Sequence, residues 1–159
     1  MRKYLKWVLT VAVLLWCVFI WQFSTATGEA SSATSGGVVD FCNQVLQSAG
    51  VKVEVSGNTV RKTAHFTEFF VLGVLVAWAL LAHGFRHWLL LSPAPVLLVA
   101  AIDECIQLFV PERGPHVLDV LLDFAGGLCG MLVFFLFFLL VSYIINKRKE
   151  KNKEISKTS

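Results

Sequence analysis

Ionisable and amide side chains recur inside the apolar stretches of this sequence, at spacings that matter for chemistry. Three pairs stand three or four residues apart: His65 with Glu68, Asp103 with Gln107, and Asp119 with Asp123. Residues at these spacings share one face of an α-helix. An imidazole beside carboxylates can transfer protons or hold a divalent metal ion, and such a group can also bind a charged ligand.

Further charged residues flank the pairs: Lys62, Glu104 and Arg113. Glu104 follows Asp103 directly, so on a helix it points about 100° away and is placed to pair with an arginine. Arg113 lies in the turn 111–116, which two prolines stiffen. It can therefore be held above the pairs, where a guanidinium grips phosphate or carboxylate with two hydrogen bonds.

Each of these residues also has a structural interpretation. Asp119 suits the positive end of a helix dipole, and Gln107 suits a hydrogen bond between membrane helices. The whole set then reads as a buried salt-bridge network that holds the helices together. The number of carboxyl groups in so small a chain favours a polar pocket over that network, and both interpretations stay open.

The elements that position these residues are membrane helices. Hydrophobic residues make up 56% of the 159-residue chain and charged residues 16%, and the mean hydropathy is +0.68. This composition excludes an ordinary soluble domain. The sequence predicts an all-α, polytopic bundle of four transmembrane helices in one domain, 1–146. The spans are expected at about 5–23, 64–83, 88–109 and 117–146.

Basic residues at both ends predict that both termini are cytoplasmic, with the outer loop 24–61 on the other side of the plasma membrane. Within the loop, 38–49 has the periodicity of a short amphipathic helix and 51–55 alternates as extended chain does. The tail 147–159 is expected to be basic, cytoplasmic and frayed. A cleaved signal peptide is the rival interpretation of the first span, whose tryptophans suit an anchor better.

Neighbouring spans run antiparallel, so the start of the second, the end of the third and the start of the fourth share one depth. This topology places the three pairs together in the outer leaflet. Ionisable groups that face lipid cost several kcal/mol each, so they are expected to face each other, water or a ligand. Asp103 and Asp123 lie too far inside their spans for interfacial water to solvate them.

Four segments of the chain form a recognisable pattern: Arg61–Phe69, Asp103–Gly114, Val117–Gly127 and the phenylalanine–serine stretch at Gln22–Ser24. They resemble the signatures of the VanZ-like membrane proteins. Glu112 stands where glycine is common in the family, and His116 where a small polar residue is common. The resemblance implies a multi-span bacterial membrane protein of the cell envelope. It also implies a link to low-level resistance to the glycopeptide teicoplanin, the property associated with the founding member.

Three functions follow as hypotheses. The first is an outward-facing pocket that binds an amphiphile or partner, with membrane lipids and a lipid-linked cell-wall precursor or lipoglycopeptide as candidate partners. The second is a membrane-embedded enzyme, such as a metal-dependent hydrolase, although no HExxH, GxSxG or P-loop pattern is present. The third is a small transporter or proton-coupled protein. We expect no cofactor, no resident metal and no nucleic-acid partner, while catalytic residues and oligomeric state are left undetermined.

Overall fold

The computed structural model describes residues 2–25, 28–50, 54–111 and 117–158, and all regular structure in that part of the chain is helical. The helices are α1 (Arg2–Ser24), α2 (Gly28–Ser48), α3 (Gly57–Ala82), α4 (Trp88–Leu91), α5 (Pro93–Gln107) and α6 (Val117–Thr158). The predicted all-α class is confirmed.

Among the described residues, four stretches are long and apolar enough to cross a membrane. They are Tyr4–Ser24, Gly57–Ala82, Trp88–Gln107 and Val117–Lys153. Large apolar side chains cover their outer surfaces, including Leu15, Leu98 and Phe137, each more than half exposed. Such surfaces are stable in lipid and not in water, so the chain is a multi-pass membrane protein, as predicted.

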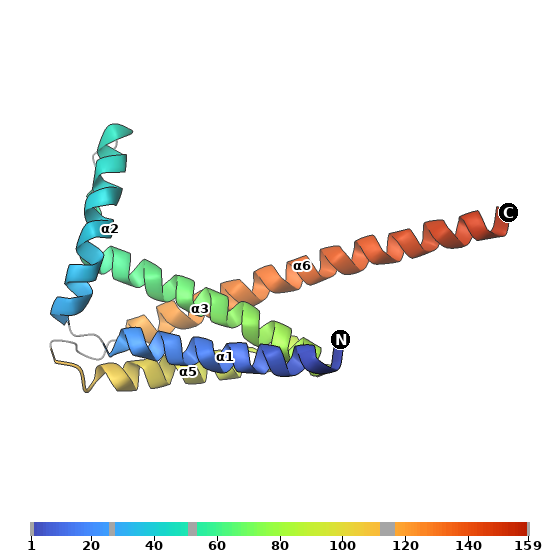
Figure 1. Cartoon of the computed structure of the whole chain (residues 1–159), viewed down its shortest axis with the longest axis horizontal. Helices are drawn as coiled ribbons and strands as arrows, with labels where there is room; N and C mark the ends of the chain where they lie inside the picture. The colour runs from blue at the N-terminus through green and yellow to red at the C-terminus, as the bar shows by residue number, and fades with distance from the viewer. Residues whose placement is uncertain (1, 26–27, 51–53, 112–116, 159) are drawn as a thin grey trace.

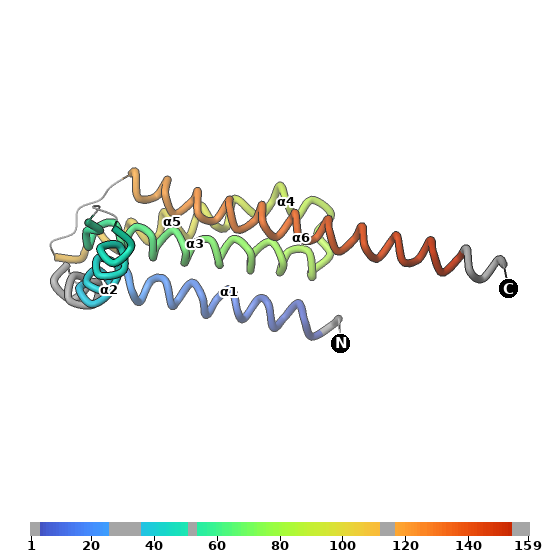
Figure 2. Tube along the Cα trace, turned by 90° about the horizontal axis from the view of Figure 1, so that it is seen from above, coloured from blue at the N-terminus to red at the C-terminus, as the bar shows by residue number. Residues whose placement is uncertain are grey.

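Helix α3 lies at the centre of the bundle and packs most extensively against α6, then against α1 (Figures 1 and 2). Its side chains Phe69 and Leu72 are fully buried, together with Ile20 of α1 and Val96 of α5. Helix α3 is therefore packed against α1, α5 and α6 just after the turn that carries His65 and Glu68.

Glycines allow α6 to cross α3 with the two backbones in contact. A Cβ atom at Gly126 would meet the backbone of Phe66, and one at Gly130 would meet that of Phe70. Gly73 of α3 lies against the backbone of Gly127 in the same way. Small residues four apart are a common device for close helix contact in membranes, and this one fixes how far α6 lies from α3.

Helix α2 lies across one end of the bundle (Figures 1 and 2). Its side chains Val38, Phe41 and Val45 are about half exposed or more. Asn43 ties α2 to the start of α3: its Oδ1 accepts a hydrogen bond from the amide of Val55 at 2.7 Å. An apolar helix face that lies across the spans suits the membrane–water interface.

The start of α1 and the end of α6 lie at the same end of the bundle, opposite α2 (Figure 1). This matches the even number of predicted spans. The cytoplasmic placement of that end stays a prediction.

Several boundaries differ from those predicted. α3 begins at Gly57, before the predicted 64, because Ser56 accepts a hydrogen bond from Thr59 N at 3.3 Å and caps the helix. α2 is longer than the predicted 38–49, because it also includes the serine- and glycine-rich stretch from Gly28. The expectation of extended chain at 51–55 falls mainly on residues outside the described part.

The third span is divided between α4 and α5 at Ser92, directly before Pro93, and it ends at Gln107 rather than 109. Proline occupies the first turn of α5, where its missing N–H costs nothing. α6 continues as helix through most of the tail that was expected to fray. The tail is rich in lysine and glutamate, which are good helix formers.

Candidate functional site

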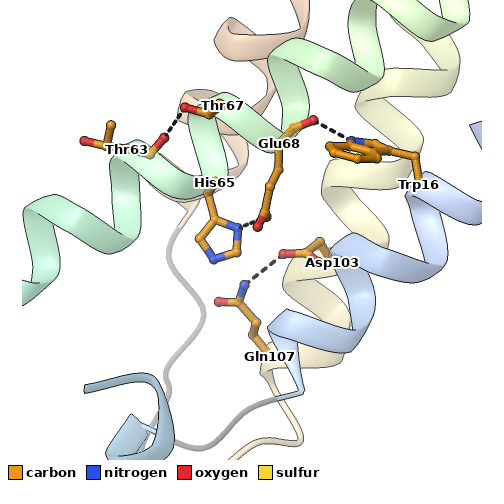
Figure 3. Close-up of polar contacts among 7 residues, drawn as sticks. All are labelled: Trp16, Thr63, His65, Thr67, Glu68, Asp103 and Gln107. Carbon is orange, nitrogen blue, oxygen red and sulfur yellow. Dashed lines mark hydrogen bonds and ion pairs between the residues drawn. The ribbon is translucent and has the colours of Figure 1, made fainter. Parts of the chain in front are cut away.

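The second span supplies a histidine and a glutamate from one face of α3. His65 Nδ1 lies 3.5 Å from Glu68 Oε2, and both side chains are more than four-fifths buried. Helix α1 supports this turn, because Trp16 Nε1 donates a hydrogen bond of 2.9 Å to the carbonyl oxygen of Glu68 (Figure 3). The predicted pair on a shared face is confirmed.

The third span supplies Asp103 and Gln107 from the last turns of α5. Asp103 is fully buried and Gln107 is 7% exposed. Gln107 Nε2 donates a hydrogen bond of 2.9 Å to Asp103 Oδ2 (Figure 3). The amide therefore bonds within its own helix to the aspartate four residues earlier, rather than to another helix.

The fourth span supplies Asp123, which is 4% exposed. Its Oδ1 is buried and has no hydrogen-bond partner among the described residues. A buried carboxylate oxygen without a donor is unfavourable by several kcal/mol in an apolar setting. Asp123 lies one turn before Gly126, so the close crossing of α6 with α3 brings it to this site.

The three spans converge on one point. His65, Asp103 and Asp123 each place one potential ligand atom within 4.8 Å of the other two. We call His65, Asp103 and Asp123, together with Glu68 and Gln107, the polar cluster. As predicted, Asp103 and Asp123 are too deeply buried for interfacial water to solvate them.

Other predicted site residues lie around the polar cluster. Lys62 Nζ forms an ion pair of 3.1 Å with Asp119 Oδ1. With Asn58, Arg61 and Leu118 they line a small pocket of about 210 Å³. Lys62 therefore supplies a positive partner for Asp119.

Glu104 is half-buried and is not one of the three residues whose ligand atoms meet. This agrees with the expectation that Glu104, which follows Asp103 directly, points in a different direction from Asp103 around the helix. Arg113 and the rest of 112–116 lie outside the described residues, so the expectation that Arg113 stands above the polar cluster stays a prediction.

A groove beside the polar cluster was not foreseen from the sequence. It has a volume of about 640 Å³ and lies between Trp16 and Phe19 of α1, Val38 and Cys42 of α2, and the face of α3 from Thr59 to Val71. Glu68 is part of its lining, so the groove adjoins the polar cluster. We call it the α1–α3 groove. Val38 and Cys42, the α2 residues in its lining, both belong to the helix predicted at 38–49.

The fold and the polar cluster define a multi-pass membrane protein with a buried acid–imidazole site at one end of its bundle. The VanZ/LLP1 family model matches residues 9–140, so the chain belongs to the VanZ family. Comparison with curated proteins found no match, and comparison with solved structures found none either.

Proposed function

We propose that this VanZ-family protein binds an amphiphile of the bacterial cell envelope at the outer leaflet of the plasma membrane. The apolar chain of the ligand lies in the α1–α3 groove and its polar head group lies at the end of the bundle where α2 lies. One observation carries the proposal: the α1–α3 groove and the polar cluster adjoin at Glu68. In this proposal both termini are cytoplasmic.

The α1–α3 groove has the chemistry that an acyl or prenyl chain requires. Aromatic and aliphatic side chains from three helices line it, and its volume falls within the range of about 300–1,000 Å³ that small-molecule sites occupy. Thr63 and Thr67 on its α3 wall bond to carbonyl oxygens one turn earlier in their own helix. Their methyl groups can then contact the ligand chain.

The head group of the proposed ligand is anionic. Arg61 and Lys62 lie at the start of α3, within two turns of Glu68 in the sequence. The Lys62 side chain is 42% exposed while it pairs with Asp119. Basic side chains at a membrane surface attract anionic head groups, and the exposed part of Lys62 is free to do so.

Two kinds of envelope molecule fit this description. A lipid-linked cell-wall precursor joins a long prenyl chain to phosphate groups, and a lipoglycopeptide such as teicoplanin joins an acyl chain to a polar peptide. The link between the founding VanZ-like protein and teicoplanin makes the second worth testing directly. Under this proposal, any resistance follows from binding at the α1–α3 groove.

The test uses the full chain in lipid nanodiscs and a photoreactive polyprenyl phosphate. We expect labelled peptides from α1, α2 and the first half of α3, with labelling reduced by teicoplanin if the two ligands share the site. The variant Ala64→Trp fills the groove from α3 and should abolish labelling. The control Leu136→Trp adds the same bulk to a lipid-facing position of α6 that is 55% exposed.

Equal labelling of the two variants would refute the proposal, as would labelled peptides confined to the lipid-facing surface of α6. Both variants are checked for a single elution peak and unchanged helicity, so that loss of labelling is not loss of fold.

A further inference from the structure

We infer that His65, Asp103 and Asp123 bind a divalent transition-metal ion, Zn²⁺ or Mn²⁺, where α3, α5 and α6 meet. The inference goes beyond amphiphile binding and does not depend on it. It begins from the three ligand atoms that lie within 4.8 Å of one another. Two ligands at about 2.05 Å from a tetrahedral Zn²⁺ are roughly 3.4 Å apart, so small side-chain rotations close the site.

Asp123 shows independently that the site is built for a positive ligand. Its side chain is 4% exposed, and its buried Oδ1 has no hydrogen-bond donor among the described residues. Membrane proteins rarely bury a carboxylate without pairing it. Lys62, the lysine at the same end of α3, is 3.1 Å from Asp119, one turn away along α6. A metal ion between His65, Asp103 and Asp123 would supply the missing positive charge.

Two neighbours have the positions of residues that orient metal ligands. Glu68 Oε2 lies 3.5 Å from His65 Nδ1, longer than a hydrogen bond. A small rotation would bring the carboxylate to the position from which it orients a metal-binding imidazole. Gln107 Nε2 donates to Asp103 Oδ2 and so holds that carboxylate in place. Figure 3 shows the imidazole between Glu68 and the Gln107 amide.

The donor set selects the class of metal ion. One imidazole and two carboxylates match Zn²⁺ and Mn²⁺ better than Mg²⁺ or Ca²⁺, which prefer oxygen alone, and better than Cu⁺, which prefers sulfur. The HxxE spacing of His65 and Glu68 is weak evidence for a metal site by itself, because it is common by chance. The site depends on Asp103 and Asp123, which come from two other helices.

The experiment uses the full chain in detergent, purified with an affinity tag that contains no histidine and then treated with chelator. Titration calorimetry with ZnCl₂ and with MnCl₂ is expected to show one equivalent of at least one ion bound. Asp123→Asn should weaken that binding by more than ~100-fold, and Gln107→Ala, which leaves all three ligands in place, by ~10-fold. The matched control Asp40→Asn removes an exposed carboxylate on α2 and should leave the affinity unchanged.

Failure of chelator-treated wild-type protein to bind either ion would overturn the inference, whatever the variants do. Equal affinities of wild type and a well-folded Asp123→Asn would overturn it too. If Asp123→Asn does not fold, Gln107→Ala and the wild type still decide the question. Photolabelling of the α1–α3 groove is repeated in the presence of chelator, so that loss of metal binding and loss of amphiphile binding are distinguished.

Discussion

Replacing Gly126 with alanine adds one methyl group where α6 crosses α3. The new carbon would lie 2.5 Å from the carbonyl oxygen of Phe66, whereas ordinary van der Waals contact begins at 3.4 Å. The atom it meets belongs to a helix backbone and cannot rotate away. The two helices must therefore separate locally by about 0.9 Å, which moves Asp123, one turn earlier, away from His65.

Over-packing of this kind costs about 1–3 kcal/mol. For a chain of this size, each kcal/mol lowers Tm by about 2–4 °C, so we expect Gly126→Ala to melt roughly 2–12 °C below the wild type. The assay is thermal unfolding of the purified protein in detergent, followed by helicity.

The control is Gly36→Ala on α2, where an added Cβ meets nothing within 4 Å. Alanine is favoured over glycine in a helix by about 0.5–1 kcal/mol, so this variant should melt at or slightly above the wild-type temperature. A Gly126→Ala protein as stable as the wild type, or more stable, would refute the close crossing of α3 and α6.

The remaining predictions concern single contacts and the membrane orientation. Trp16→Phe keeps the aromatic ring but removes the 2.9 Å bond to the Glu68 carbonyl, so thermal unfolding should show a loss of about 0.5–1.5 kcal/mol; no loss would mean that α1 is not anchored there. Lys62→Gln breaks a half-exposed ion pair with Asp119 and should cost under ~1 kcal/mol, less at high salt; a larger or salt-independent cost would contradict the exposed position of Lys62. A membrane-impermeant maleimide added to intact cells should label Cys42 on α2, and labelling only after permeabilisation would reverse the predicted orientation.

Much of the fold could be predicted, because the bilayer imposes long apolar helices on any chain that crosses it. The four spans followed from composition and length, and the pairing of Asp103 with Gln107 and of His65 with Glu68 followed from helical spacing. The end of the bundle at which these pairs meet followed from antiparallel topology. None of these inferences requires knowledge of how the helices are rotated.

Predicting the polar cluster would have required knowing how each helix is rotated about its axis. Sequence spacing alone does not give that rotation. Asp119 and Asp123 share a face of α6, yet Asp119 pairs with Lys62 while Asp123 is buried beside Asp103. The two residues differ in depth, because Asp119 lies in the first turn of α6 and Asp123 one turn further in. The spacing of Gly126 and Gly130 is a signal that would have pointed to the α3–α6 crossing. The Trp16 bond has no sequence signature, because its acceptor is a backbone carbonyl.

The structure also changes which functional hypotheses have support. The α1–α3 groove, which depends on the position of α2 across the bundle, supports amphiphile binding. The partly unpaired Asp123 within the polar cluster supports a metal ion. The two sites meet at Glu68, so a ligand bound in the α1–α3 groove would lie near any metal ion held by His65, Asp103 and Asp123.

The convergence of α3 and α6 at the polar cluster underlies both proposals, and cysteine cross-linking tests it most directly. In a background without the four native cysteines, the double variant His65→Cys/Asp123→Cys is expected to form a disulfide rapidly on mild oxidation. The control pair Thr63→Cys/Asp123→Cys should not, because Thr63 lines the α1–α3 groove on another face of α3. Rapid cross-linking of the control pair, or none between positions 65 and 123, would contradict the account.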